Sequence, residues 1–468
     1  MSLCSHGQRG LFTMKVLLAV LLVLSSAVQA TRFYSYEVHD PRFVDAVVLT
    51  NSNAAAVEAY LALQPVGAPL AIRVLEDLGK NNAAVKSLFN SVAITHVFAD
   101  FETGDVVART AALKALVGSS TKSKNAFVGN YAFAPIKGSD PTRPAGDASG
   151  KGKGKGKDSA DKDYKKSNAT MANENLYPGS PSFRNPDPDG AGPLTANGSS
   201  TAPNVRSALF VLPVIRAGLV EDAMGKGKGK GKDKNVPHIP YVARFNNWGN
   251  SSLDSDMDPS NGYQFSTTNQ LLSRGDFSAQ VLHYRLRGAD SVFAFQPGVV
   301  GYDEAMMQED IVRGWEDDPM IQWVNQVFAG KDVKLTRLAE GKTIIDGVNQ
   351  PGENKGVIYS GVANTKSSTG AAAQLAILLS NLDEQSHVVK IPSQDGKKLL
   401  TQLFAIEAGT HRLLKFELQK KPAAGWKLIG NDIVFEDHDR AGTGIPEPGV
   451  LSLLVMGTGL GLLRRRRA

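Results

Sequence analysis

The chain has 468 residues, of which 42% are hydrophobic and 21% charged, so it is long enough for two folded domains. The single cysteine, Cys4, lies within a predicted export signal, ahead of its apolar core, which excludes disulfides, zinc–thiolate sites and cysteine nucleophiles from the mature protein. The net charge of +6 comes from three basic runs with four Lys or Arg each, at 151–157, 226–232 and 464–467. The remaining chain is mildly acidic, so the basic pI is no argument for nucleic-acid binding.

The first predicted element is an export signal at residues 1–30. Lys15 supplies a positive charge, Val16–Leu24 is a short apolar run, and Val28-Gln29-Ala30 is a small-residue cleavage pattern. We expect cleavage after Ala30, because the apolar run is too short for a permanent membrane anchor.

Residues 31–135 alternate apolar runs with amphipathic stretches. This repeated strand–helix alternation predicts parallel strands with helices outside them. A helix-start signal at 51–53 supports the first of these helices. The predicted strands are 45–50, 70–75, 94–100 and 125–131, and the predicted helices are 54–63, 76–90 and 106–117.

Two polar stretches, 136–203 and 225–235, interrupt the alternation. They are rich in Gly, Pro, Ser, Asp and Lys, and Lys-Gly repeats cannot bury apolar surface, so we predict disordered or loosely held insertions, with 175–179 as a candidate ordered island. Their basic runs suit contact with anionic polysaccharide, nucleic acid or lipid headgroups, although a solvated loop is the simpler interpretation. The other predicted elements of this part are strands at 238–245 and 291–296, and helices at 205–224, 277–288, 304–315 and 319–328.

The pattern changes at about residue 333, where short strands separated by turn signals predict an antiparallel β-sandwich over 333–440. The predicted fold is therefore α/β. A (β/α)8 barrel-like domain with disordered insertions covers 31–332, the β-sandwich follows, and a linker and tail occupy 441–468.

We predict a C-terminal membrane-anchor helix in the tail. Its three ordered parts are a turn at Pro446, Glu447 and Pro448, an uncharged apolar run at Gly449–Leu463, and a basic end at Arg464, Arg465, Arg466 and Arg467. A helix over the apolar run is roughly 22 Å long, shorter than a hydrocarbon core of about 30 Å. The arginine end is expected on the cytoplasmic side, by the positive-inside rule.

This ordered tail resembles the PEP-CTERM sorting signal of bacteria that make extracellular polysaccharide. The resemblance implies a location in the cell envelope or at the cell surface, with transient membrane anchoring through the C-terminal helix. It also implies an exosortase-type processing enzyme as a partner. Extracellular polysaccharide is a further candidate partner. No nucleic-acid partner is expected.

Candidate chemistry lies at the ends of predicted strands, where parallel barrels place their functional residues. Asp100 and Glu102 end one strand and are about 6.6 Å apart on an extended backbone. Paired carboxylates are what glycoside hydrolysis needs, so both are candidate catalytic residues. The alternative is that they cap the following helix. The plan of an exported alternating domain plus a sandwich is similar to many glycoside hydrolases in architecture alone.

Candidate substrate-binding residues end two other strands, because amides bond hydroxyl groups and an indole stacks on a sugar ring. They are Asn246, Asn247, Trp248 and Gln296. A turn stabilised by the asparagines is the alternative. No motif predicts a cofactor or a metal. We therefore expect an exported envelope protein with a carbohydrate-active or carbohydrate-binding barrel, or alternatively a non-catalytic surface or matrix protein with a degenerate barrel.

Overall fold

The computed structural model describes residues 32–75, 78, 82–101, 104–131, 135, 159–176, 202–224, 236–244, 272–295, 302–318, 320–328, 335–338, 343–344, 357–364, 374–382, 386–390, 403–418 and 426–435. These residues belong to one compact unit, Met1–Phe435. The predicted export signal, both Lys-Gly runs and the sorting tail lie outside the described residues.

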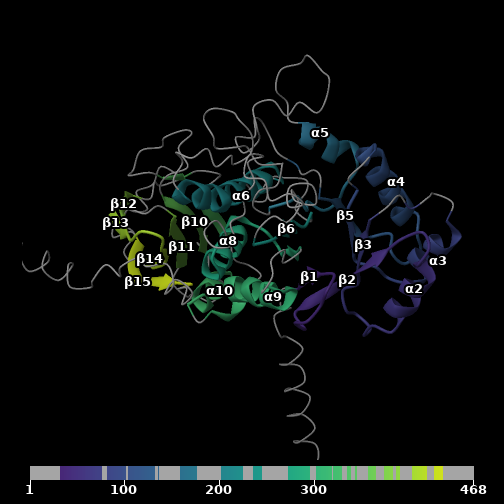
Figure 1. Ribbon diagram of the computed structural model, residues 1–468, viewed down its shortest axis with the longest axis horizontal. Coiled ribbons are helices and arrows are strands. Elements are labelled where there is room, and N and C mark those ends of the chain that lie inside the picture. The colour runs from purple at the N-terminus through teal and green to yellow at the C-terminus, as the bar shows by residue number, and fades with distance from the viewer. Residues whose placement is uncertain are drawn as a thin grey trace, which may run out of the picture. The chain divides into compact units, whose positions relative to one another are not determined.

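A curled, barrel-like sheet of parallel strands forms the first half of the fold (Figure 1). Its seven strands have the order β5-β4-β3-β2-β1-β7-β6, and every neighbouring pair is parallel. The alternation therefore predicted the parallel sheet correctly, whereas β1 is too short to show any periodicity. The strands are β1 (Phe33–Ser35), β2 (Phe43–Leu49), β3 (Ala71–Val74), β4 (His96–Ala99), β5 (Phe127–Asn130), β6 (Tyr241–Val242) and β7 (Phe293–Ala294).

Helices connect most successive strands, as right-handed crossovers between parallel strands require. Local signals start several of them: Asn82 accepts a hydrogen bond from Val85 N at 3.1 Å, and Ser273 forms a capping box with Asp276. The connection from β1 to β2 has no helix. The helices are α2 (Ala54–Ala62), α3 (Ala83–Ser91), α4 (Val106–Gly118), α5 (Ser159–Lys166), α6 (Ala202–Met224), α8 (Arg274–Arg287) and α9 (Glu304–Val312).

Part of the stretch predicted to be a disordered insertion is ordered, which corrects that prediction. Helix α5 forms within it, and residues 170–176 pair with both edge strands of the sheet. Thr170 N donates to Val128 O of β5 at 2.8 Å, and a parallel bridge joins Ala172 to His238, just before β6. Only the end of this segment, 175–176, falls within the candidate ordered island at 175–179. The rest was missed because its few apolar residues stand among polar ones, with no period to detect.

The second half of the fold is antiparallel, as predicted. A six-stranded sheet has the order β15-β14-β11-β10-β8, with β9 also paired to β10, and β12 and β13 form a separate hairpin. The sequence pattern predicts short strands in this part that each overlap one of the observed strands, but it misses β8, and it places the start of β15 at 432 and not at Trp426. The predicted strands are 343–348, 356–363, 375–380, 387–391, 399–407, 411–418 and 432–436. The strands are β8 (Leu335–Leu338), β9 (Thr343–Ile344), β10 (Val357–Asn364), β11 (Gln374–Asn381), β12 (His387–Lys390), β13 (Leu403–Ile406), β14 (His411–Leu418) and β15 (Trp426–Val434).

Each face of the antiparallel sheet is buried by a different partner. Ile358 and Leu378 face a core shared with α8 and with α10 (Gln322–Phe328), while Tyr359 and Ile377 face the β12–β13 hairpin. A continuous apolar core therefore links the sheet to the helices of the first half. Within the described ranges, no helix is long and apolar enough to cross a membrane.

Candidate functional site

An ion pair stands at the carboxyl end of two neighbouring parallel strands. Asp100 directly follows β4 and is 6% exposed, and its N–H donates to Val74 O at 2.7 Å, which continues the pairing with β3. Arg73 of β3 donates from Nε to Asp100 Oδ2 at 2.9 Å, and its Nη2 contacts the same oxygen. Strand pairing thus brings the two charges together.

Two aromatic rings enclose the guanidinium of this pair. The central carbon of Arg73 lies 5.2 Å from the ring centroid of Tyr36, just after β1, and 5.2 Å from that of Phe295, just after β7. Burial lowers the pKa of Arg73, but the neighbouring Tyr241 and Asp100 outweigh it and raise that pKa, so the side chain stays a cation. We call Arg73, Asp100, Tyr36 and Phe295 the strand-end cluster.

The inner face of the curled sheet carries an amide that lacks partners. Asn173, from the segment that pairs with both sheet edges, is fully buried, and neither its Nδ2 nor its Oδ1 has a hydrogen-bond partner among the described residues. A Cβ at Gly129 of β5 would overlap Asn173 Oδ1, so only glycine leaves room for this amide. Gly129 pairs in register with Phe98, which lies in the inner core.

Aromatic rings fill the sheet around these polar groups. The Phe98 and Phe293 centroids are 4.7 Å apart, and Tyr241 stacks on Phe293 at 4.4 Å. These rings belong to a core with members from strands all along the sheet, which holds the backbone under the strand-end cluster in a fixed geometry.

The structure places one of the predicted site residues. Asp100 stands at a strand end, as expected, and it pairs with Arg73; the following helix α4 is capped instead by Asp105, which accepts from Ala108 N at 2.9 Å. The remaining predicted site residues, Glu102, Asn246, Asn247, Trp248 and Gln296, lie outside the described residues.

Sequence reasoning missed the residues that surround Asp100. Arg73 interrupts an otherwise apolar predicted strand, and a charge in a buried strand is a signal that could have singled it out. Phe295 stood inside a predicted strand and looked like ordinary core. Tyr36 and Asn173 offered no signal, because the short strand and the pairing segment that carry them were not predicted.

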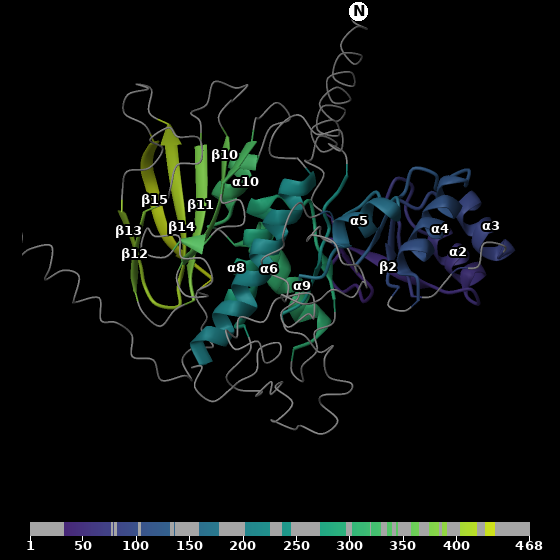
Figure 2. The ribbon, with the colours of Figure 1, turned by 90° about the horizontal axis from the view of Figure 1, so that it is seen from above.

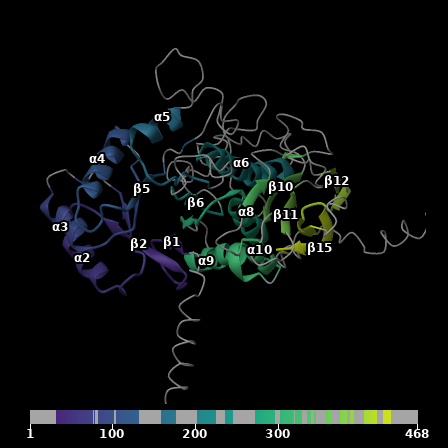
Figure 3. The ribbon, with the colours of Figure 1, turned by 180° about the vertical axis from the view of Figure 1, so that it is seen from behind.

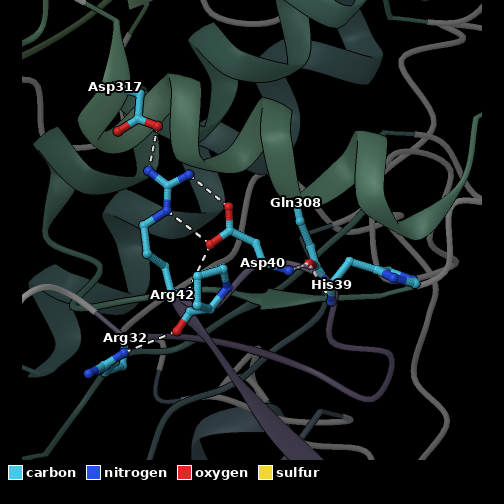
Figure 4. Close-up of polar contacts among 7 residues, drawn as sticks. Arg32, His39, Asp40, Arg42, Gln308 and Asp317 are labelled. Atoms are coloured by element: carbon cyan, nitrogen blue, oxygen red, sulfur yellow. Dashed lines mark hydrogen bonds and ion pairs between the residues drawn. The ribbon is translucent and has the colours of Figure 1, made fainter.

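A hollow lies outside the sheet, between the β1–β2 connection and α9. It has a volume of about 500 Å³. Arg42 is one of its lining residues (Figure 4): Nη2 donates to Asp40 Oδ2 at 2.7 Å, and Nη1 donates to Asp317. The hydrogen bond from Arg42 lowers the pKa of Asp40. Figure 3 shows α9 beside β1, where Ser35 donates to Glu304.

Gln308 fixes the helix-free connection along this groove. Its Oε1 accepts from the backbone N–H of His39 at 3.1 Å and of Asp40 at 2.8 Å, and its Nε2 donates to Glu37 O. The side chain of Gln308 therefore holds this connection in place, whereas the other connections are held by the packing of their helices. The groove is a weaker candidate site than the strand-end cluster, because it lies outside the curled sheet and not at the carboxyl ends of the strands, where parallel barrels bind their ligands.

The comparisons with known proteins carry no residue roles to this chain. No family model matches it, and no curated protein matches it significantly. Among the described residues, no group of His, Cys, Asp and Glu side chains is arranged to hold a metal ion.

Proposed function

We propose that this is an exported cell-envelope protein that binds carbohydrate at the carboxyl end of its parallel strands. The observation that carries the proposal is the strand-end cluster, in which Arg73 and Asp100 stand between the rings of Tyr36 and Phe295. Carboxylate and guanidinium groups bond vicinal hydroxyls, and aromatic rings stack on the apolar faces of sugars. Strand ends are also where barrel proteins bind their ligands.

We infer that the curled parallel sheet is a degenerate (β/α)8 barrel. The segment 170–176 would serve as its eighth strand, because that segment is hydrogen-bonded to both β5 and the residues before β6. The degeneracy is the β1–β2 connection, where Gln308 and the groove replace a helix.

Glycoside hydrolysis is the second candidate, because Asp100 is a carboxylate at a strand end. Paired with Arg73, it suits the ionised partner of a catalytic pair, which acts as nucleophile or base. Glu102 is then the candidate acid. A non-catalytic matrix role requires binding without hydrolysis.

Binding is tested by affinity electrophoresis against a panel of soluble bacterial polysaccharides. Arg73→Met and Asp100→Asn are each expected to weaken binding by about 10- to 100-fold, because each removes charge-assisted hydrogen bonds worth about 1.5–3 kcal/mol. Arg42→Met is the matched control, since it breaks an ion pair of the same kind in the groove. Circular dichroism checks that all three variants fold.

Equal binding by the wild type and both strand-end variants contradicts the proposal. Release of reducing sugar by the wild type, and its loss in Asp100→Asn with folding intact, identifies hydrolysis. Binding without any release identifies the non-catalytic role.

The proposed location rests on the tail and on an exosortase-type enzyme that processes it. Deleting 446–468 is expected to leave the mature protein unprocessed and to release it into the periplasm or medium, because the apolar run and its arginine end are gone. Cell fractionation and intact-mass measurement check this. Unchanged retention in the membrane contradicts a sorting role for the tail.

A further inference from the structure

A buried polar chain joins α8 to the antiparallel sheet, across a junction that is otherwise apolar. Helices α6 and α8 lie side by side here, and α8 packs against β10 (Figure 2). All members of the chain are at most 3% exposed. We call it the junction relay, and it consists of Arg287, Ser360, His283, Ser380, His411 and Asp276.

The relay begins at a group that can only donate hydrogen bonds. Arg287 Nε donates to Ser360 Oγ at 2.7 Å, and Arg287 Nη2 donates to Tyr359 O at 3.0 Å. Ser360 Oγ lies 2.7 Å from His283 Nδ1. The guanidinium of α8 is thus bound to strand β10 twice, through a backbone carbonyl and through a hydroxyl that leads onward.

The relay ends at a group that can only accept hydrogen bonds. His283 Nε2 lies 2.8 Å from Ser380 Oγ of β11, and that oxygen lies 2.7 Å from His411 Nδ1 of β14. His411 Nε2 lies 2.9 Å from Asp276 Oδ1. Asp276 accepts a further bond from Ser273 N at 3.2 Å, within the capping box of α8.

The two ends determine the direction of every hydrogen bond between them. Because Ser360 accepts from Arg287, its hydroxyl hydrogen is available for His283 Nδ1. His283 Nε2–H then donates to Ser380, which donates to His411 Nδ1. His411 Nε2–H finally donates to the carboxylate of Asp276. Each hydroxyl and each imidazole gives one hydrogen and receives one.

We infer that the junction relay holds α8 against the antiparallel sheet only while the imidazole of His283 is neutral, so that the junction opens on acidification. A proton added to His283 turns Nδ1 from an acceptor into a donor that faces the hydroxyl of Ser360, which already accepts from Arg287. This change breaks the single direction that satisfies all members.

The surroundings of His283 offer little to stabilise such a proton. Helix α8 contributes the cation Arg287, while β10 and β11 contribute hydroxyls. Asp276 lies at the far end of the relay, against His411. Phe210 of α6 places its ring 5.5 Å from that of His283 and 5.6 Å from that of His411. Burial, with the charge of Arg287, keeps the pKa of His283 well below its usual range.

The order Asp276–His411–Ser380 matches the order of groups in hydrolytic triads, but the relay is a positioning device. Ser380 Oγ is fully buried and already lies between two imidazoles, so its hydroxyl is engaged on both sides. A nucleophile needs a free approach to its oxygen. The relay therefore aligns α8 with three strands and does no chemistry on a substrate.

Hydrogen–deuterium exchange of the full chain at pH 7.5 and pH 5.0, corrected for intrinsic rates, tests the inference. At pH 5.0 an open junction protonates His283, whose ordinary pKa is about 6.5, and this shifts the opening equilibrium by up to about 30-fold. Exchange in β10 and β11 is expected to rise by about this factor. His283→Gln, which cannot titrate, is expected to lose most of the pH dependence.

His39→Gln is the matched control, because His39 is exposed and lies in the groove. The inference is overturned if exchange in β10 and β11 does not depend on pH in the wild type. It is also overturned if His283→Gln keeps the full pH dependence of the wild type. Should the glutamine variant fail to fold, long-range proton–nitrogen spectra of the wild type at pH 7.5 decide. They are expected to show an unprotonated Nδ1 and a protonated Nε2 on His283, and a protonated Nδ1 on His283 overturns the inference.

Discussion

The charge of a buried histidine in this protein depends on the hydrogen-bond partners of its two ring nitrogens. His238 lies between two carboxylates, with Nδ1 2.7 Å from Glu221 Oε1 and Nε2 2.8 Å from Glu174 Oε1. Carboxylates only accept, so both nitrogens donate and the ring is a cation. His283 lies between two hydroxyls and is neutral. Burial lowers the pKa of His238, but the two glutamates outweigh it and raise that pKa to about 10.

This cation predicts a loss of stability at alkaline pH. The folded pKa of His238 lies above the unfolded value of about 6.5, so its contribution is complete below pH 6.5 and disappears as the pH rises through about 10. We expect His238→Gln to lower the free energy of unfolding at pH 7 by about 3 kcal/mol, because it leaves buried carboxylates without their cation. Urea unfolding from pH 6 to pH 10 measures both effects.

The difference between the wild-type and His238→Gln curves isolates this residue from the lysines and tyrosines that also titrate near pH 10. That difference should shrink as the pH rises. A constant difference across the range would show that His238 contributes by packing and not by charge.

At the scale of elements, helix α9 continues into a π-helical turn, η2 (Arg313–Asp317). This turn lies where a crossover helix after β1 would otherwise cover the sheet. Trp315 of this turn packs edge-on against Phe33 of β1 at 5.7 Å, and so covers the strand that lacks a crossover helix. The turn also comes close to α8: a Cβ at Gly314 would overlap the backbone carbonyl of Ser278. Ser278 in turn donates to Asp310 O at 2.9 Å.

Gly314→Ala is therefore expected to destabilise the protein by about 1–3 kcal/mol, because the added methyl group meets rigid backbone of α8. Gly118→Ala is the matched control at the end of α4, where a Cβ meets nothing within 4 Å. That change is expected to be neutral or to stabilise by up to about 1 kcal/mol. Thermal unfolding of both variants makes the comparison, and equal midpoints contradict the close approach of η2 to α8.

At the scale of the whole molecule, sequence periodicity predicts elements well and their partners poorly. Apolar runs such as 70–75 and 94–100 predicted β3 and β4, because burial on both faces of a parallel strand leaves a continuous signal. Asp100 was found as a strand-end acid. Its pairing with Arg73 was not, because which strands are neighbours is decided by the closure of the sheet, and no local pattern records it.

The junction relay was hidden for the same reason. Its members are spread over α8 and three strands, and each looks unremarkable in its own segment: His283 stands in an amphipathic helix, and Ser360 and Ser380 stand in apolar strands. Only the packing of α8 on the antiparallel sheet shows that the polar side chains of the helix form hydrogen bonds with those of the strands. Polar residues in predicted buried strands are the signal to follow in such cases.

The place of β1 within its sheet has a consequence for synthesis. β1 is the first strand of the chain, yet it lies between β2 and β7, and Ser291 Oγ, just before β7, donates to Arg32 O across 259 residues. β1 leaves the ribosome before β7, so its second edge stays unpaired until β7, near residue 293, has also been synthesised. Until then the second edge of β1 has no strand beside it, which favours chaperone binding and slows the formation of this sheet.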